Sequence, residues 1–193
     1  ADAHMQPRLG TPNVPILPTI AGIEMGKIWN TSRLRWPAGR VWGNEKGAAR
    51  GLFREHCANC HGIPGDGAGP TASFLNPYPR DYRKGQFKFK STPVGQKPTH
   101  ADLKKIVVEG IPGTAMPSFK LLPDLEVEAL VDYVKYLAVR GEVERGLLTA
   151  TTNLEENARL VGAQEKAAQQ EQIAAVKDVV AGVVERWGGA AAA

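Results

Sequence analysis

The sequence is poor in cysteine, in histidine and in long hydrophobic runs. Its 193 residues include two cysteines and four histidines. No run approaches the roughly 20 apolar residues that a membrane-spanning helix needs, so we predict no transmembrane segment. A structural zinc site needs four ligands, and no second cysteine pair is present to complete one. The start of the chain lacks the basic and apolar stretches of a signal peptide. We therefore expect a mature or excised soluble portion, and a lipid anchor on a missing N-terminus stays open.

Both cysteines lie in the run Cys57-Ala58-Asn59-Cys60-His61. Two thiols and an adjacent imidazole at this spacing are typical of a covalent haem c attachment site. Each sulfur can add to one vinyl group of haem, while the histidine places a ring nitrogen on the iron. A thioredoxin-like dithiol would need a βαβ setting, whereas the flanking residues look helical and glycine-rich. The run therefore predicts one haem c, bound through Cys57 and Cys60, with His61 as an axial iron ligand.

A second axial ligand is predicted in the loop that contains Met116. Pro112 and Pro117 restrict the backbone of this loop and can aim the thioether at the iron. A methionine that fills a gap in the core is the alternative interpretation. His100 is a second candidate ligand, because imidazole also binds iron well. We predict Met116 as the ligand.

Four further segments support a resemblance to the bacterial class I monohaem cytochromes c over about residues 44 to 141. They are a helix before the cysteines, a glycine-rich run after them, the methionine loop and a last helix; they span residues 47–53, 65–70, 113–117 and 130–137. The resemblance implies an all-α cytochrome c fold around one covalently attached haem. It departs from the family pattern at Ala49, where many relatives have glycine at the crossing of the first and last helices.

The resemblance also has implications for the site and the location of the protein. Arginines in relatives pair with a haem propionate, which suggests Arg80 or Arg83 as a further cofactor contact. A backbone carbonyl after His61, that of Pro64 or Pro70, is expected to accept from the second ring nitrogen of the histidine. Haem c attachment in this family is completed outside the cytoplasm. We therefore expect a periplasmic or equivalent extracytoplasmic location.

Punctuation by proline and glycine divides the chain into three regions. Residues 1–43 form a Pro-rich N-terminal extension, residues 44–141 the haem domain, and residues 142–193 a linker and an amphipathic helix. The extension has no sustained apolar period, which predicts an extended segment lying on another surface. Its tryptophans favour packing on the haem domain, with docking to another protein as the alternative; they are Trp29, Trp36 and Trp42.

Within the haem domain, the apolar spacing predicts three helices. The first is capped by Asn44, the second spans residues 99–109 with Thr99 and Asp102 in capping-box spacing, and the third runs from Pro123 until Arg140 and Gly141 end it. The first and third helices should cross. The long irregular stretch before the second helix is expected to wrap the haem edge, with apolar contacts from Phe74, Leu75, Phe87 and Phe89.

The C-terminal region predicts a helix over residues 154–187, capped by Asn153. Its apolar seam is formed by Ile173, Val176, Val180, Val183 and Trp187. We expect the seam to pack on the haem domain or on the N-terminal extension, and a partner-binding or dimerising helix is the alternative. Internal Gly162 and Gly182 cost roughly 1 kcal/mol each relative to alanine, which disfavours a long coiled coil. Gly188, Gly189 and the closing alanines are read as a linker.

Residues 78–105 are rich in positive charge. Eight lysines and arginines stand there against two aspartates; the positive residues are Arg80, Arg83, Lys84, Lys88, Lys90, Lys97, Lys104 and Lys105. Electron-transfer partners commonly dock through small interfaces steered by charge, so we expect redox partners with an acidic docking surface. A solvated loop is the alternative. Nucleic acid is disfavoured because no nucleic-acid-binding element organises these charges.

These observations predict an electron-transfer protein rather than an enzyme. With His61 and Met116 both on the iron, no position remains for a substrate, and the thioether raises the reduction potential. The expected function is one-electron shuttling between respiratory redox partners. Alternatives are a haem module of a larger respiratory subunit, a haem-based sensor in which Met116 is displaced, and a peroxidase.

Overall fold

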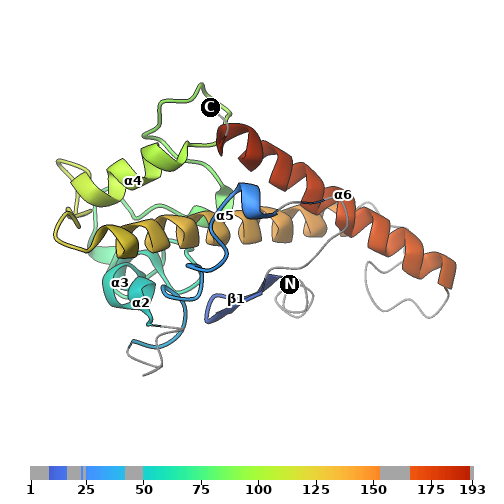
Figure 1. Cartoon of the computed structure of the whole chain (residues 1–193), viewed down its shortest axis with the longest axis horizontal. Helices are drawn as coiled ribbons and strands as arrows, with labels where there is room; N and C mark the ends of the chain where they lie inside the picture. The colour runs from blue at the N-terminus through green and yellow to red at the C-terminus, as the bar shows by residue number, and fades with distance from the viewer. Residues whose placement is uncertain (1–8, 17–22, 24, 42–49, 153–165, 192–193) are drawn as a thin grey trace.

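The computed structural model describes residues 9–16, 23, 25–41, 50–152 and 166–191. These residues are mainly helical (Figure 1), which confirms the all-α fold predicted from the sequence. The helices are α2 (Leu52–His56), α3 (Ala58–His61), α4 (His100–Glu109), α5 (Asp124–Thr152) and α6 (Lys166–Ala191), with 3-10 turns η1 (Met25–Lys27), η2 (Ala72–Phe74) and η3 (Tyr82–Lys84). Strands β1 (Gly10–Thr11) and β2 (Val14–Pro15) pair antiparallel in a short hairpin.

Helix α5 is the central element of the fold. It contacts α2, α4, η3 and α6, and every residue from Ala129 to Val143 is buried. The prediction that this helix ends at Arg140 and Gly141 is wrong, because it continues to Thr152. Gly141 serves close packing instead of termination: a Cβ built there would lie 2.3 Å from the Cβ of Arg83. The missing side chain lets η3 press against the middle of the helix.

The N-terminal extension packs on α5, as the sequence predicted. The Tyr136 hydroxyl donates to the Leu9 carbonyl at 2.7 Å, and Lys135 Nζ donates to the Ile28 carbonyl at 2.9 Å. Trp29 is 3% exposed, and its ring meets that of Tyr136 edge to face at 6.2 Å. Trp36 is partly buried against the same core, whereas Trp42 lies outside the described residues.

Helix α6 returns along α5 in a long hairpin (Figure 1). Four of the five seam residues are buried, and Ile173 is 58% exposed. The seam therefore packs within this chain, against α5 and the η1 turn of the N-terminal extension. The predicted start of the helix near residue 154 lies outside the described residues. The predicted linker at Gly188 and Gly189 is wrong, because the helix runs through both to Ala191.

The segment before the cysteines differs from the prediction. Gly51 has φ 72°, a left-handed conformation, so helix α2 begins only at Leu52. A Cβ at Gly51 would lie 2.4 Å from the Arg40 carbonyl oxygen, and the glycine thus lets the N-terminal extension approach. The predicted cap Asn44 and the predicted crossing residue Ala49 lie outside the described residues. The expected contact between first and last helices is present between α2 and α5, with the Phe53 and Tyr133 rings 5.1 Å apart.

Helix α4 begins with the capping box that the sequence predicted. The Asp102 amide donates to Thr99 Oγ1 at 3.0 Å, and the Thr99 amide donates to Asp102 Oδ2 at 2.9 Å. The helix ends at Glu109, and the amide of its C-cap Gly110 donates to the Ile106 carbonyl, which fixes the start of the loop that follows. Across the described part of the chain, no helix combines the length and apolar character needed to cross a membrane.

Candidate haem site

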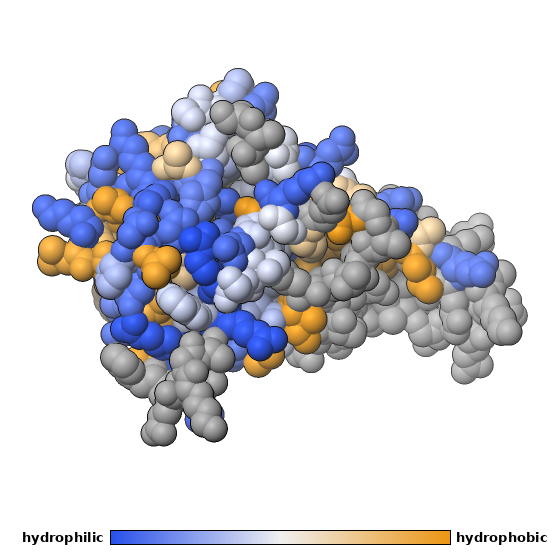
Figure 2. All heavy atoms as spheres, viewed as in Figure 1, coloured by the Kyte–Doolittle hydropathy of each residue, from blue (hydrophilic) through white to orange (hydrophobic). Residues whose placement is uncertain are grey.

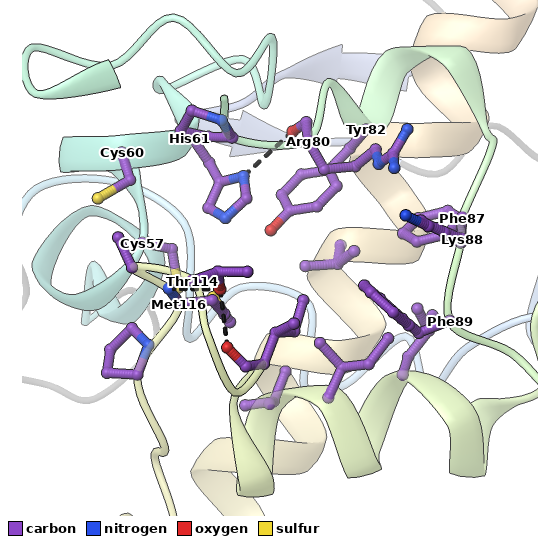
Figure 3. A pocket seen from close by; sticks show the side chains of 18 of the residues that line it. Cys57, Cys60, His61, Arg80, Tyr82, Phe87, Lys88, Phe89, Thr114 and Met116 are labelled. Atoms are coloured by element: carbon purple, nitrogen blue, oxygen red, sulfur yellow. Dashed lines mark hydrogen bonds between the residues drawn. The ribbon is translucent and has the colours of Figure 1, made fainter. Parts of the chain in front are cut away.

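A cavity of about 320 Å³ lies beside the two cysteines. Its wall is largely apolar and comes from α2, α3, the irregular segment after them, α4, the Met116 loop and α5 (Figure 3). Segments far apart in sequence therefore meet at one place. Among the residues that line it are Cys57, Cys60, His61, Leu75, Arg80, Tyr82, Phe87, Lys88, Phe89, Met116, Val131 and Val134.

His61 presents a free imidazole nitrogen to the cavity. Its Nδ1 lies 3.1 Å from the carbonyl oxygen of Arg80. A carbonyl can only accept, so Nδ1 carries the proton and donates, which leaves the lone pair on Nε2. Burial also lowers the pKa of His61, which keeps the imidazole neutral as a metal ligand must be. The expected acceptors Pro64 and Pro70 are wrong; the carbonyl that fixes the ring belongs to Arg80.

The surroundings of Cys57 oppose a thiolate. Burial, and then the charge of Cys60, raise the pKa of the Cys57 thiol to about 12. A zinc site or a reactive dithiol would require the ionised sulfur, whereas a thioether to haem is neutral. Within the described ranges, no cluster of three or more His, Cys, Asp or Glu side chains could hold a metal ion. The two sulfurs, the imidazole and the apolar wall together fit covalently bound haem.

The Met116 loop is held in place by its own hydrogen bonds. The Ile111 amide donates to the Met116 carbonyl at 3.1 Å, and the Met116 amide donates to Thr114 Oγ1 at 3.1 Å. Gly110 has φ 70°, and a Cβ there would lie 2.7 Å from the Met116 carbonyl oxygen. Glycine is therefore needed where the loop folds back. Met116 lines the cavity with the attachment residues, and its bond to iron stays a prediction.

The other candidate ligand, His100, does not line the cavity. Its Nε2 lies 3.0 Å from Glu128 Oε2, and Lys135 Nζ lies 2.9 Å from its Nδ1. Because the ammonium can only donate, Nδ1 of His100 accepts and Nε2 donates. Both ring nitrogens are therefore engaged by neighbouring side chains.

The two candidate arginines lie in different surroundings. Arg80 lines the cavity, in addition to fixing His61 through its carbonyl. Arg83 is not among the lining residues: its guanidinium donates to Asp81 Oδ1 at 3.0 Å and to Oδ2 at 3.1 Å. Asp81 also raises the pKa of Arg83, mainly through this side-chain hydrogen bond and further through its negative charge. Contact of either arginine with a propionate stays a prediction, and the geometry favours Arg80.

The irregular segment lines the cavity much as the sequence predicted. Leu75, Phe87 and Phe89 belong to the wall. Phe74 does not, since 85% of it is exposed, and its expected haem contact is wrong. The 3-10 turn η2 that contains Phe74 buries Ala72 instead.

The sequence reasoning missed Tyr82. Its ring stacks on the His61 imidazole at a centroid distance of 4.5 Å and an angle of 18°. Figure 3 shows the two rings side by side, with the Tyr82 hydroxyl directed into the cavity. No periodic pattern exists in this segment to mark an inward residue. The available signal was an aromatic side chain inside a Gly/Pro-rich stretch already assigned to the haem.

An apolar cavity that joins two neighbouring thiols to an oriented imidazole is the arrangement that covalent haem c attachment requires. In agreement, residues 46–138 match the family model described as cytochrome c. Over this stretch the chain is similar to the c-type cytochromes, and Cys57 and Cys60 are the residues that would bind haem c covalently. Electron transfer is the role that this family indicates, and the helical structure agrees with its fold.

One solved structure with a similar chain is the reducing HAO-like protein complex Kustc0457/Kustc0458 of Kuenenia stuttgartiensis. The identity is 30%, the match covers 45% of this chain and 39% of that chain, and the TM-score is 0.44. The present chain thus spans well under half of that relative. No curated protein matches the sequence.

Proposed function

We propose that this protein is a one-electron carrier of the periplasm in which His61 and Met116 are the two axial ligands. The proposal depends on one observation. Cys57, Cys60 and His61 line the same apolar cavity as Met116, although Met116 lies in a loop far from them in sequence. When bound there, haem supplies the change between ferrous and ferric iron. With both His61 and Met116 holding the iron, the protein would leave no site for a substrate.

The surrounding residues suit such a carrier. The Arg80 carbonyl holds the His61 ring in one orientation and raises its basicity as a ligand. The apolar wall, including Val131 and Val134 of α5, keeps water away and limits rearrangement when the charge changes. A thioether ligand and a low-polarity site both favour the reduced state, and we expect a comparatively high reduction potential.

The Met116 ligand can be tested by spectroscopy of the full chain. Met116→Ala should abolish the weak far-red absorption band that sulfur on ferric iron produces. Met25→Leu is the matched control, because Met25 is 6% exposed in the core and does not line the cavity. A far-red band that survives in Met116→Ala would eliminate Met116 as the ligand.

Carbon monoxide distinguishes the carrier from a sensor or a peroxidase. Those alternatives need an open or displaceable iron position, so their ferrous form takes up carbon monoxide rapidly and tightly. The ferrous form of the carrier should not bind carbon monoxide at the same concentration. Met116→Ala should then gain carbon monoxide binding, which also serves as the positive control.

The proposed partner has an acidic docking surface. Three of the basic residues contribute less positive charge to this surface, because Arg83, Lys97 and Lys104 are paired with carboxylates. Arg80 and Lys88 are exposed and line the cavity, so their charge lies where the haem edge would be reached. Opposite charge there steers association, and salt screens it over about 8–10 Å at physiological strength.

A charge reversal tests this surface with ferricyanide, a small anionic oxidant. Lys88→Glu should slow the oxidation of the ferrous protein. Rising ionic strength should likewise slow the oxidation of the unmodified protein. Lys177→Glu makes the same change at an exposed position on α6 and should have little effect. Rates that are insensitive to ionic strength would contradict the proposed steering.

The periplasmic location is tested separately, by fractionation of cells that express the native gene.

A further inference from the structure

Three aromatic side chains lead from His61 to the C-terminal helix. Tyr82 stacks on the His61 imidazole, and Phe87 stacks on Tyr82 with ring centroids 6.1 Å apart and an angle of 14°. Trp187 of α6 then meets Phe87 edge to face at 6.1 Å. We call Tyr82, Phe87 and Trp187 the aromatic series. Its members near the cavity are seen in Figure 3, where Tyr82 and Phe87 follow His61 along the wall.

The far end of the series is fixed by buried polar groups. Trp187 is 2% exposed, and its Nε1–H donates to Glu142 Oε1 at 2.8 Å. Lys97 Nζ binds Glu142 Oε2 at 2.7 Å and lies 5.3 Å from the centroid of the Trp187 ring. A hydrogen bond and a cation over the ring leave this indole little freedom. Trp187 is therefore a rigid support for Phe87.

Helix α6 is not part of the cytochrome c match, which ends at residue 138. Its seam residues nevertheless reach the wall of the haem cavity, because Trp187 contacts Phe87 and Phe87 lines that cavity. The support of the His61 ring thus extends beyond the family unit. If α6 only covered the core, apolar contacts with α5 would be sufficient. The aromatic series leading to His61 would then have no purpose.

We propose that Trp187 is a positioning residue for the proximal imidazole. Through Phe87 and Tyr82 it holds the His61 ring in its orientation and keeps water from it, so that α6 raises the reduction potential. Ligand orientation and burial are two of the means by which a protein sets a haem potential. The inference rests on the proposed role of His61 as axial ligand, and it is independent of Met116 and of the redox partner.

The test is potentiometry of the full holoprotein with Trp187→Leu. Loss of the ring lets water approach His61 and favours the ferric form. We expect at least a threefold fall in the ratio of reduced to oxidised protein at fixed ambient potential, or about 28 mV at about 59 mV per tenfold for a one-electron couple. Tyr82→Leu, which removes the ring next to the ligand, should cause a fall at least as large.

Val176→Ala is the control for general loosening of α6. Val176 is 1% exposed on the same helix, and at 1.5 Å per residue it lies about 16 Å along the axis from Trp187. It should lower the thermal midpoint without the potential shift. Trp187→Phe keeps a ring against Phe87 and should stay close to the unmodified potential. If Trp187→Leu does not accumulate as folded holoprotein, Phe87→Leu breaks the same series and carries the same expectation.

A double variant tests whether the effect passes through Tyr82. The potential shift of Tyr82→Leu with Trp187→Leu should not exceed that of Tyr82→Leu alone, since contacts acting in series are not additive. Additive shifts, or equal potentials for Trp187→Leu and Val176→Ala, would overturn the proposal. The visible spectrum of each variant separates this outcome from failure of the proposed function, because loss of His61 ligation changes the spectrum itself.

Discussion

Removal of one buried charge offers a sharp test of how α6 is attached. Lys97 and Glu142 form an ion pair at 2.7 Å, and their side chains are 8% and 7% exposed. Lys97 Nζ also donates to the Gly85 carbonyl at 2.9 Å. Lys97→Met keeps much of the side-chain volume but leaves the Glu142 carboxylate without its main cationic partner. Arg186 remains near Glu142 at 3.5 Å, but it is largely exposed and screened.

The expected cost follows from the burial of that carboxylate. Breaking a buried pair by removing one partner typically costs about 3–5 kcal/mol, because the other charge stays desolvated. We expect this loss in the free energy of unfolding, measured by urea titration of the holoprotein with circular dichroism. In a chain of this size, each kcal/mol lowers the thermal midpoint by about 2–4 °C.

Two controls separate the pair from the substitution itself. Lys84→Met makes the same change at an exposed lysine and should stay within about 0.5 kcal/mol. The double variant Lys97→Met with Glu142→Gln removes both charges and keeps an acceptor for the Trp187 Nε1–H, so it should recover most of the loss. A cost below about 1 kcal/mol for Lys97→Met alone would refute the reasoning.

Three smaller predictions test other parts of the fold by the same urea titration. Thr99→Ala removes the capping box of α4 and should cost about 1 kcal/mol, and a neutral result would contradict the cap. Burial, and then Lys135, lower the pKa of His100, so stability should fall as the pH drops below the unfolded value near 6.5; His100→Gln should flatten that fall. The titratable groups around His100 are Glu128, Asp132 and Lys135. Phe74→Ser should change stability by less than about 0.5 kcal/mol and leave the visible spectrum unaltered.

Local chemistry made part of the structure predictable. The attachment run is defined by residue types at fixed spacing, and the cap of α4 by Thr99 and Asp102 three residues apart. The loop of Met116 was found because two prolines and glycines mark it between helices. In each case the evidence lies within a few residues along the chain, which is the range over which sequence spacing fixes geometry.

Features that depend on distant partners could not be predicted in the same way. The carbonyl that fixes His61 comes from Arg80, 19 residues later, and a backbone acceptor has no sequence signature. Tyr82 lies in an irregular segment, where no period separates inward from outward side chains. The end of α5 was placed too early, because glycine after arginine is a common stop signal, whereas Gly141 is buried under Arg83.

The polar residues of α5 show why the contacts of this helix could not be predicted from its apolar periodicity. Asp132, Lys135 and Arg140 break the apolar pattern, yet they are 1%, 4% and 3% exposed. Their partners are far along the chain: Lys135 binds the Ile28 carbonyl at a separation of 107 residues, and Arg140 the Gly10 carbonyl at 130. A buried charge is tolerated only when it is paired or hydrogen-bonded. Lys135 and Arg140 therefore fix where the N-terminal extension lies on α5, and Glu142 does so for α6.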